Sequence, residues 1–150
     1  MFRGVTTGVA IGAAIALAAA SVILAQTGKP SGAKSVMHDI TVKADAVYTG
    51  TIETAITGGK VTGNLHITAP TEIVGTVAGT SKAGVMSLDF PYEMTQRKCT
   101  GTVKMTIKLP AKPGLATGTM EAAGCGRTDA NKLTGTVEMT PAAAKKSAKG

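Results

Sequence analysis

The side chains of this sequence that could do chemistry include only two cysteines and two histidines. Cys99 and Cys125 lie at the two ends of a segment whose middle, residues 110–114, reads PAKPG, a turn-forming stretch. The pair has no Cys-x-x-Cys spacing, which makes a redox or zinc motif a poor interpretation. We therefore predict that a Cys99–Cys125 disulfide bond joins the two arms of a hairpin, as is typical of proteins in oxidising compartments.

The other candidate reactive residues form no recognisable catalytic pattern. His38 and His66 have no cysteine or carboxylate at metal-ligand spacing. The methionines are scattered singly, which favours core filling over a copper site. No nucleophile-elbow sequence is present. We expect a protein that is not an enzyme, with no catalytic residues, no metal and no cofactor.

Basic residues are the remaining chemical signal, because the formal net charge is +7. The segment from Met94 to Met120 contains several cations and no acidic residue. One interpretation is a solvated lysine face that protects strand edges. The other is contact with an anionic envelope surface. Nucleic acid is not expected as a partner, because aromatic stacking residues and binding motifs are missing. The candidate surface residues are Arg97, Lys98, Lys104, Lys108, Lys145, Lys146 and Lys149.

A short pattern repeated along the chain predicts the elements that carry these residues. It occurs as YTGTIE at 48–53, CTGTVK at 99–104 and LTGTVE at 133–138, and in three further variants. Side chains of a strand alternate between its faces, so the glycine and its apolar flanks point one way and the threonines the other. Residues 85–95 alternate in the same way without the glycine. We predict an all-β domain with one buried face.

The turns between these segments predict antiparallel pairing. Gly58-Gly59 suits a two-residue hairpin, which would pair Ile56 with Val61 and Ile52 with Leu65. About seven or eight strands with short turns indicate an up-and-down meander that forms a small barrel or a two-sheet sandwich.

The cysteine hairpin requires a correction to simple symmetry. Pairing about Lys112 would set apolar residues against threonines. We therefore predict a register shift by one residue, which turns Gly118 and Met120 inward. A bulge near residues 123–124 would then return Cys125 to the side of Cys99.

The inward glycines allow two interpretations of the interior. Glycines let strands bend and approach closely, with Phe90, Leu88 and Tyr92 filling the space. Alternatively, the space they leave could hold a small apolar ligand. The candidate lining residues are Ile52, Leu65, Val77, Met86, Leu88, Phe90, Tyr92, Val103, Met105, Met120 and Val137.

The chain divides by composition into four parts. Residues 1–25, with Arg3 before a continuous apolar run, are typical of a signal peptide. A membrane anchor is the alternative, because small residues recur there every fourth position. We predict a linker at 26–35, the β-domain at 36–140 and a basic flexible tail at 141–150. Either interpretation of the first segment exports the domain, to the periplasm or outside the cell, or holds it there on an N-terminal helix.

These observations predict a non-catalytic exported β-domain, acting as an envelope-associated structural or interaction protein. The alternative is a carrier that binds a small apolar ligand inside the barrel. The sequence identifies no specific partner beyond these two classes, an anionic envelope surface or a small apolar ligand.

Overall fold

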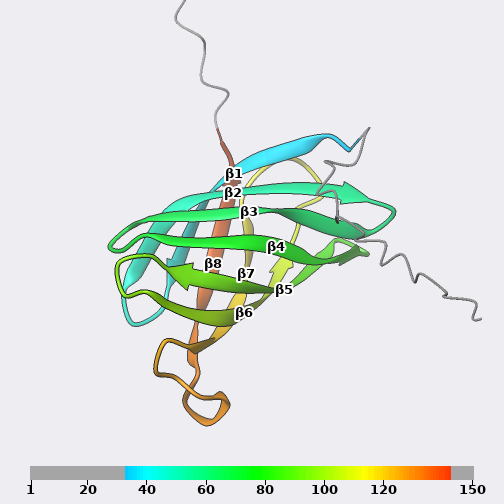
Figure 1. The fold of residues 1–150 in the computed structure, drawn as a ribbon. Helices are drawn as coiled ribbons and strands as arrows, with labels where there is room; N and C mark the ends of the chain where they lie inside the picture. Colours follow the sequence, from blue (N-terminus) through cyan, green and yellow to red (C-terminus); the bar gives the residue numbers. More distant parts are fainter. Residues whose placement is uncertain (1–32, 143–150) are drawn as a thin grey trace, which may run out of the picture.

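The computed structural model describes residues 33–142, which form a closed barrel of antiparallel strands in the order β1-β2-β3-β4-β5-β6-β7-β8 (Figure 1). A short 3-10 helix, η1, precedes the last strand. The strands are β1 (Ser35–Lys43), β2 (Val47–Thr57), β3 (Lys60–Ala69), β4 (Ile73–Lys82), β5 (Val85–Met94), β6 (Cys99–Lys108), β7 (Ala116–Gly124) and β8 (Leu133–Pro141), with η1 at Asp129–Asn131.

The predicted all-β meander is confirmed, and the barrel alternative is the correct one. β1 pairs with β2 on one side and with β8 on the other, so the sheet closes on itself. Burial alternates along the strands, as in β6, where Val103, Met105 and Ile107 are buried between exposed residues. The buried apolar residues of all eight strands form one core inside the barrel.

Both predicted hairpin registers are present. Ile56 pairs with Val61 across the Gly58-Gly59 turn. In the cysteine hairpin Ile107 pairs with Gly118, which is the predicted shift by one residue.

The end of that hairpin explains how the cysteines meet. Gly124 and Cys125 have φ angles of 97° and 52°, left-handed conformations that turn the chain sharply after β7. The Cys99–Cys125 disulfide bond is therefore present, with a Cα–Cα distance of 5.2 Å.

The mid-strand glycines lie where neighbouring backbones approach closely. A Cβ at Gly63 would overlap the carbonyl oxygen of Glu53, and one at Gly118 would overlap that of Thr106. Such contacts let a small barrel curve tightly.

Side chains of β5 fill the space beside other glycines. A Cβ at Gly75 would lie 3.0 Å from the ring of Phe90, and one at Gly101 would lie 2.7 Å from the ring of Tyr92. The β4–β5 ladder is interrupted between the pairs Gly75–Tyr92 and Gly79–Leu88. The interrupted stretch contains Pro91, which has no N–H to donate to a neighbouring strand.

The two ends of the barrel differ. Loops 44–46, 70–72, 95–98 and 125–132 gather at the end that we call the tyrosine end, toward the lower left of Figure 1. The start of β1, the end of β8 and the three remaining turns form the opposite end. The predicted segment 1–25 and most of the predicted linker and tail lie outside the described residues. Within residues 33–142 there is no helix long and apolar enough to cross a membrane.

Candidate functional site

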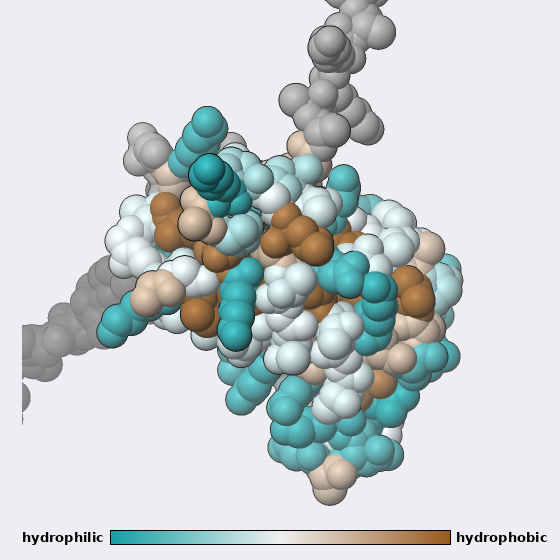
Figure 2. Space-filling model, turned by 180° about the vertical axis from the view of Figure 1, so that it is seen from behind, coloured by the Kyte–Doolittle hydropathy of each residue, from teal (hydrophilic) through white to brown (hydrophobic). Residues whose placement is uncertain are grey.

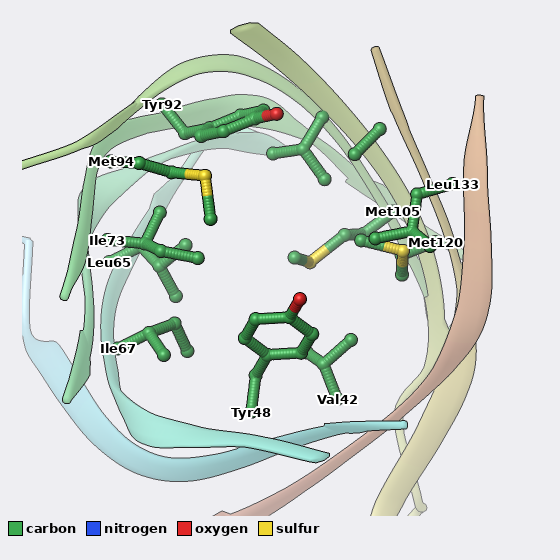
Figure 3. Close-up of a pocket in the computed structure, with 12 residues that line it drawn as sticks. Val42, Tyr48, Leu65, Ile67, Ile73, Tyr92, Met94, Met105, Met120 and Leu133 are labelled. Atoms are coloured by element: carbon green, nitrogen blue, oxygen red, sulfur yellow. The ribbon is translucent and has the colours of Figure 1, made fainter. Parts of the chain in front are cut away.

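An apolar cavity of about 70 Å³ lies inside the barrel beneath the tyrosine end. Figure 3 shows Tyr48 and Tyr92 on opposite walls, with the thioethers of Met94, Met105 and Met120 between them. Apart from the two phenol hydroxyls, the lining side chains are hydrocarbon or thioether. The cavity is lined by Val42, Tyr48, Leu65, Ile67, Ile73, Tyr92, Met94, Val103, Met105, Met120, Ala122 and Leu133.

A wider polar bowl of about 450 Å³ lies at the same end. It shares five lining residues with the cavity: Tyr48, Tyr92, Met94, Ala122 and Leu133. Its wall includes side chains from all the loops of the tyrosine end. These polar residues are Asp45, Thr71, Gln96, Arg97 and Arg127. An apolar cavity below a polar rim is the usual arrangement of a small-molecule site at a barrel mouth.

A chain of hydrogen bonds runs along one side of the bowl. The Tyr48 hydroxyl donates to Asp45 Oδ1 at 2.8 Å, and Arg127 Nη2 donates to Asp45 Oδ2 at 3.0 Å. Burial raises the pKa of Tyr48, and the hydrogen bond to the Asp45 carboxylate raises it further. The phenol therefore stays protonated at neutral pH.

Elsewhere in the bowl, the Tyr92 hydroxyl and the Arg97 guanidinium have no hydrogen-bond or ion-pair partner within residues 33–142. Burial also raises the pKa of Tyr92, so its hydroxyl is a permanent donor at neutral pH. Among residues 33–142, no hydrogen bond occupies the Tyr92 hydroxyl and no ion pair involves Arg97. Both groups are available to a hydrogen-bond acceptor in the bowl.

The disulfide bond holds the loop that carries Arg127. The backbones of Gly124 and Arg127 exchange two hydrogen bonds, of 2.8 and 3.0 Å, which close a tight turn around Cys125. The disulfide ties this turn to Cys99 at the start of β6. The position of the Arg127 guanidinium in the bowl thus depends on the cysteine pair.

The structure divides the predicted lining residues into two groups. Leu65, Tyr92, Val103, Met105 and Met120 line the cavity. The others are packed in the core away from it: Ile52, Val77, Met86, Leu88, Phe90 and Val137. The interior is thus mostly filled, and the open space is confined to one end.

Sequence reasoning missed several residues of the site. Tyr48 is the first residue of a repeated motif, and its inward direction was readable from that pattern. The other residues of the cavity were not predicted, because no local sequence pattern shows which inward-facing residues lie near an open end of the barrel. The missed cavity residues are Val42, Tyr48, Ile67, Ile73, Met94, Ala122 and Leu133.

The predicted cationic residues do not form one surface. Arg97 and Lys98 lie in the β5–β6 loop at the tyrosine end, whereas Lys108 ends β6 at the opposite end. Lys104 lies between them, 3.6 Å from Asp89 on β5 and paired in register with Glu121 on β7. Lys145, Lys146 and Lys149 lie outside the described residues.

The exposed His66 belongs to a small cluster of hydrogen-bonded polar side chains near the tyrosine end. His66 Nε2 lies 3.1 Å from Glu72, and the Thr95 hydroxyl donates to the same carboxylate at 2.7 Å. These hydrogen bonds, first that of Thr95, lower the pKa of Glu72. The His66 imidazole and the Thr95 hydroxyl both contact the Glu72 carboxylate and not each other. A catalytic triad instead needs the imidazole between the hydroxyl and the carboxylate, so this cluster does not activate a nucleophile. Within residues 33–142, no three His, Cys, Asp or Glu side chains gather as metal ligands.

Comparison with models of known families, with curated proteins and with solved structures finds no match for this chain. Function has to be inferred from the residues themselves.

Proposed function

We propose that this protein is a non-catalytic binding barrel that holds a small amphipathic molecule at its tyrosine end. The observation that carries the proposal is the apolar cavity of about 70 Å³ opening beside a polar bowl of about 450 Å³. The cavity accepts a small apolar group, and the bowl receives a polar head.

The size of the cavity limits the apolar part of the ligand. A dry cavity of about 150 Å³ binds benzene, so about half that volume admits only a short or slender group. Three methionines line the space, and their unbranched side chains adapt easily to an occupant. A ligand somewhat larger than the empty cavity is therefore compatible with it.

The chemistry of the bowl suggests the polar head. The Tyr92 hydroxyl and the Arg97 guanidinium are donors. Gln96 accepts a hydrogen bond from Thr71 at 3.0 Å through its carbonyl, which leaves its amide group to donate. We expect a head rich in acceptors, such as a carbonyl or carboxylate.

An exported location is part of the proposal, with the periplasm or the cell exterior as the compartment. The disulfide bond supports it, because disulfides persist in oxidising environments. The first function predicted from the sequence, an envelope-associated structural or interaction role, is compatible with the same location.

Native mass spectrometry of the protein isolated gently from its own host tests the proposal. We expect a discrete extra mass that denaturation removes. Ala122 is buried and lines both cavity and bowl, so Ala122→Leu should fill the cavity and abolish the extra mass. Ala78→Leu, on the exposed face of β4, is the matched control and should retain it.

Either of two results would overturn the proposal: a wild-type protein without bound mass, or an Ala122→Leu variant that keeps it. If Ala122→Leu does not fold, Arg97→Gln on the exposed rim replaces it. That variant should weaken retention of the ligand without changing the melting temperature.

A further inference from the structure

The barrel end opposite the tyrosine end is a continuous rim built from five parts of the chain. They are residues 33–36, the turns at 57–60, 82–85 and 108–116, and residues 140–142. Neighbouring turns are tied together, since Ser81 N donates to Gly59 O at 2.7 Å and Leu109 N donates to Gly84 O at 2.8 Å. The end of β8 is tied to β1 by Ala142 N donating to Met37 O at 2.9 Å. These segments therefore present one surface, which we call the lysine end.

The charged side chains of the lysine end are all positive. Each of its segments except the last contains a lysine, and none contains Asp or Glu. Among the described residues these lysines enter no ion pair, whereas Lys43, Lys104 and Lys132 outside this end each pair with a carboxylate. The exposed lysines of the lysine end are Lys34, Lys60, Lys82, Lys108 and Lys112.

Large apolar side chains are exposed between these lysines. Val36, Ile56 and Leu115 are 42%, 45% and 53% exposed. Val36 and Ile56 continue the inward-facing rows of β1 and β2 past the last layer of the core, so no strand covers them. In Figure 2, brown side chains lie among teal ones at the upper left, toward this end of the barrel.

We propose that the lysine end docks on the surface of an anionic lipid bilayer. Lysines attract the charged headgroups, and exposed apolar side chains enter the boundary between headgroups and acyl chains. The chain enters β1 and leaves β8 at this end, so the first and the last of the described residues both lie on this surface. The proposal is independent of the ligand proposed for the tyrosine end.

This surface differs from the cationic set chosen from the sequence. Of the described members of that set, only Lys108 belongs to the lysine end. Arg97 and Lys98 lie at the opposite end, where Asp45, Glu72 and Asp129 also occur in the loops.

Tryptophan probes test the orientation of docking, because the chain contains no tryptophan. Leu115→Trp places a probe on the lysine end, and Val47→Trp, at a position 57% exposed at the tyrosine end, is the matched control. The full chain is mixed with vesicles of phosphatidylcholine and phosphatidylglycerol that carry brominated acyl chains. We expect bromine to quench the probe at 115 and to leave the probe at 47 bright. Equal quenching of both, or quenching of the control alone, would overturn the proposal.

Charge variants test the role of the lysines. A variant with Lys60→Gln, Lys82→Gln and Lys108→Gln should partition about 100-fold less onto the anionic vesicles, from about 1 kcal/mol for each lysine near the surface. A control with Lys98→Gln, Lys104→Gln and Lys132→Gln loses the same charge elsewhere and should change far less. Equal losses in the two variants, no loss in the first, or equal wild-type binding to pure phosphatidylcholine would each contradict anionic docking through this end.

Discussion

Single residues decide how much of the interior is open. Phe90 is 2% exposed, and its ring rests on the face of Gly75. A side chain at position 75 would displace the ring, so the glycine and the aromatic residue form one packing unit. Tyr92 rests on Gly101 in the same way, but at the level of the cavity, where its hydroxyl reaches an open end. The same pairing of glycine with an aromatic ring thus fills the core in one layer and lines the cavity in another.

Truncation of Phe90 should measure this packing. We expect Phe90→Ala to lower the free energy of unfolding by about 3–5 kcal/mol, the usual cost of a buried phenylalanine and its cavity. Denaturant unfolding gives the value, and Thr102→Ala on the exposed face of β6 should change it by less than about 0.5 kcal/mol. A loss for Phe90→Ala as small as that of the control would mean that the ring is not packed.

At the scale of elements, the β6–β7 hairpin connects the disulfide bond to the polar bowl. The hairpin register brings apolar residues of both strands into the barrel, and the sharp turn after β7 then returns Cys125 to Cys99. Arg127 follows two residues later, and its guanidinium holds Asp45 in the loop between β1 and β2. One covalent bond therefore positions a loop at the mouth of the barrel.

Removal of the disulfide should destabilise the fold and loosen the mouth. The cysteines are 26 residues apart, and a Cys99→Ser and Cys125→Ser double variant should lose about 3–4 kcal/mol through the larger chain entropy of its unfolded state. Denaturant unfolding measures the loss, and native mass spectrometry reports ligand retention. An Arg127→Gln variant separates the two effects, because it should weaken retention while keeping most of the stability. Unchanged stability of the double variant would show that the hairpin holds without the bond.

At the scale of the whole molecule, the two ends of the barrel differ in chemistry. The tyrosine end combines a cavity with hydrogen-bond donors. The lysine end combines exposed apolar side chains with lysines that form no ion pair within residues 33–142. A bilayer bound at the lysine end would leave the bowl facing away from the lipid. Ligand could then exchange with the surrounding solution while the barrel stays docked.

The intact mass of the protein from its own host tests the predicted processing. Cleavage after Ala25 would give a mass that starts at Gln26, and the disulfide would lower it further by a pair of hydrogens. Reduction of the disulfide before the measurement is the control, since it should raise the mass only by the two hydrogens of the restored thiols. A full-length mass would favour the membrane anchor instead, and an unreduced mass without the deficit would contradict a disulfide in the native protein.

The sequence by itself determined the local features of this protein. Alternation gave each strand its inward and outward face, since successive side chains point to opposite sides. The apolar pattern around residues 109–115 required the shifted register, because the unshifted one would have buried Thr117 and Glu121. The predicted bulge near residues 123–124 is wrong, because the register continues to Gly124 and a left-handed turn at Gly124 and Cys125 brings the cysteines together.

Only the tertiary structure decided where each inward residue lies along the barrel. Leu65 and Ile52 are register partners with the same inward direction, yet Leu65 lines the cavity and Ile52 does not. Height along the axis depends on strand tilt and on the stagger accumulated around the closed barrel, which no local pattern contains. The face of a residue is a local property, whereas its height along the barrel axis depends on how the barrel closes.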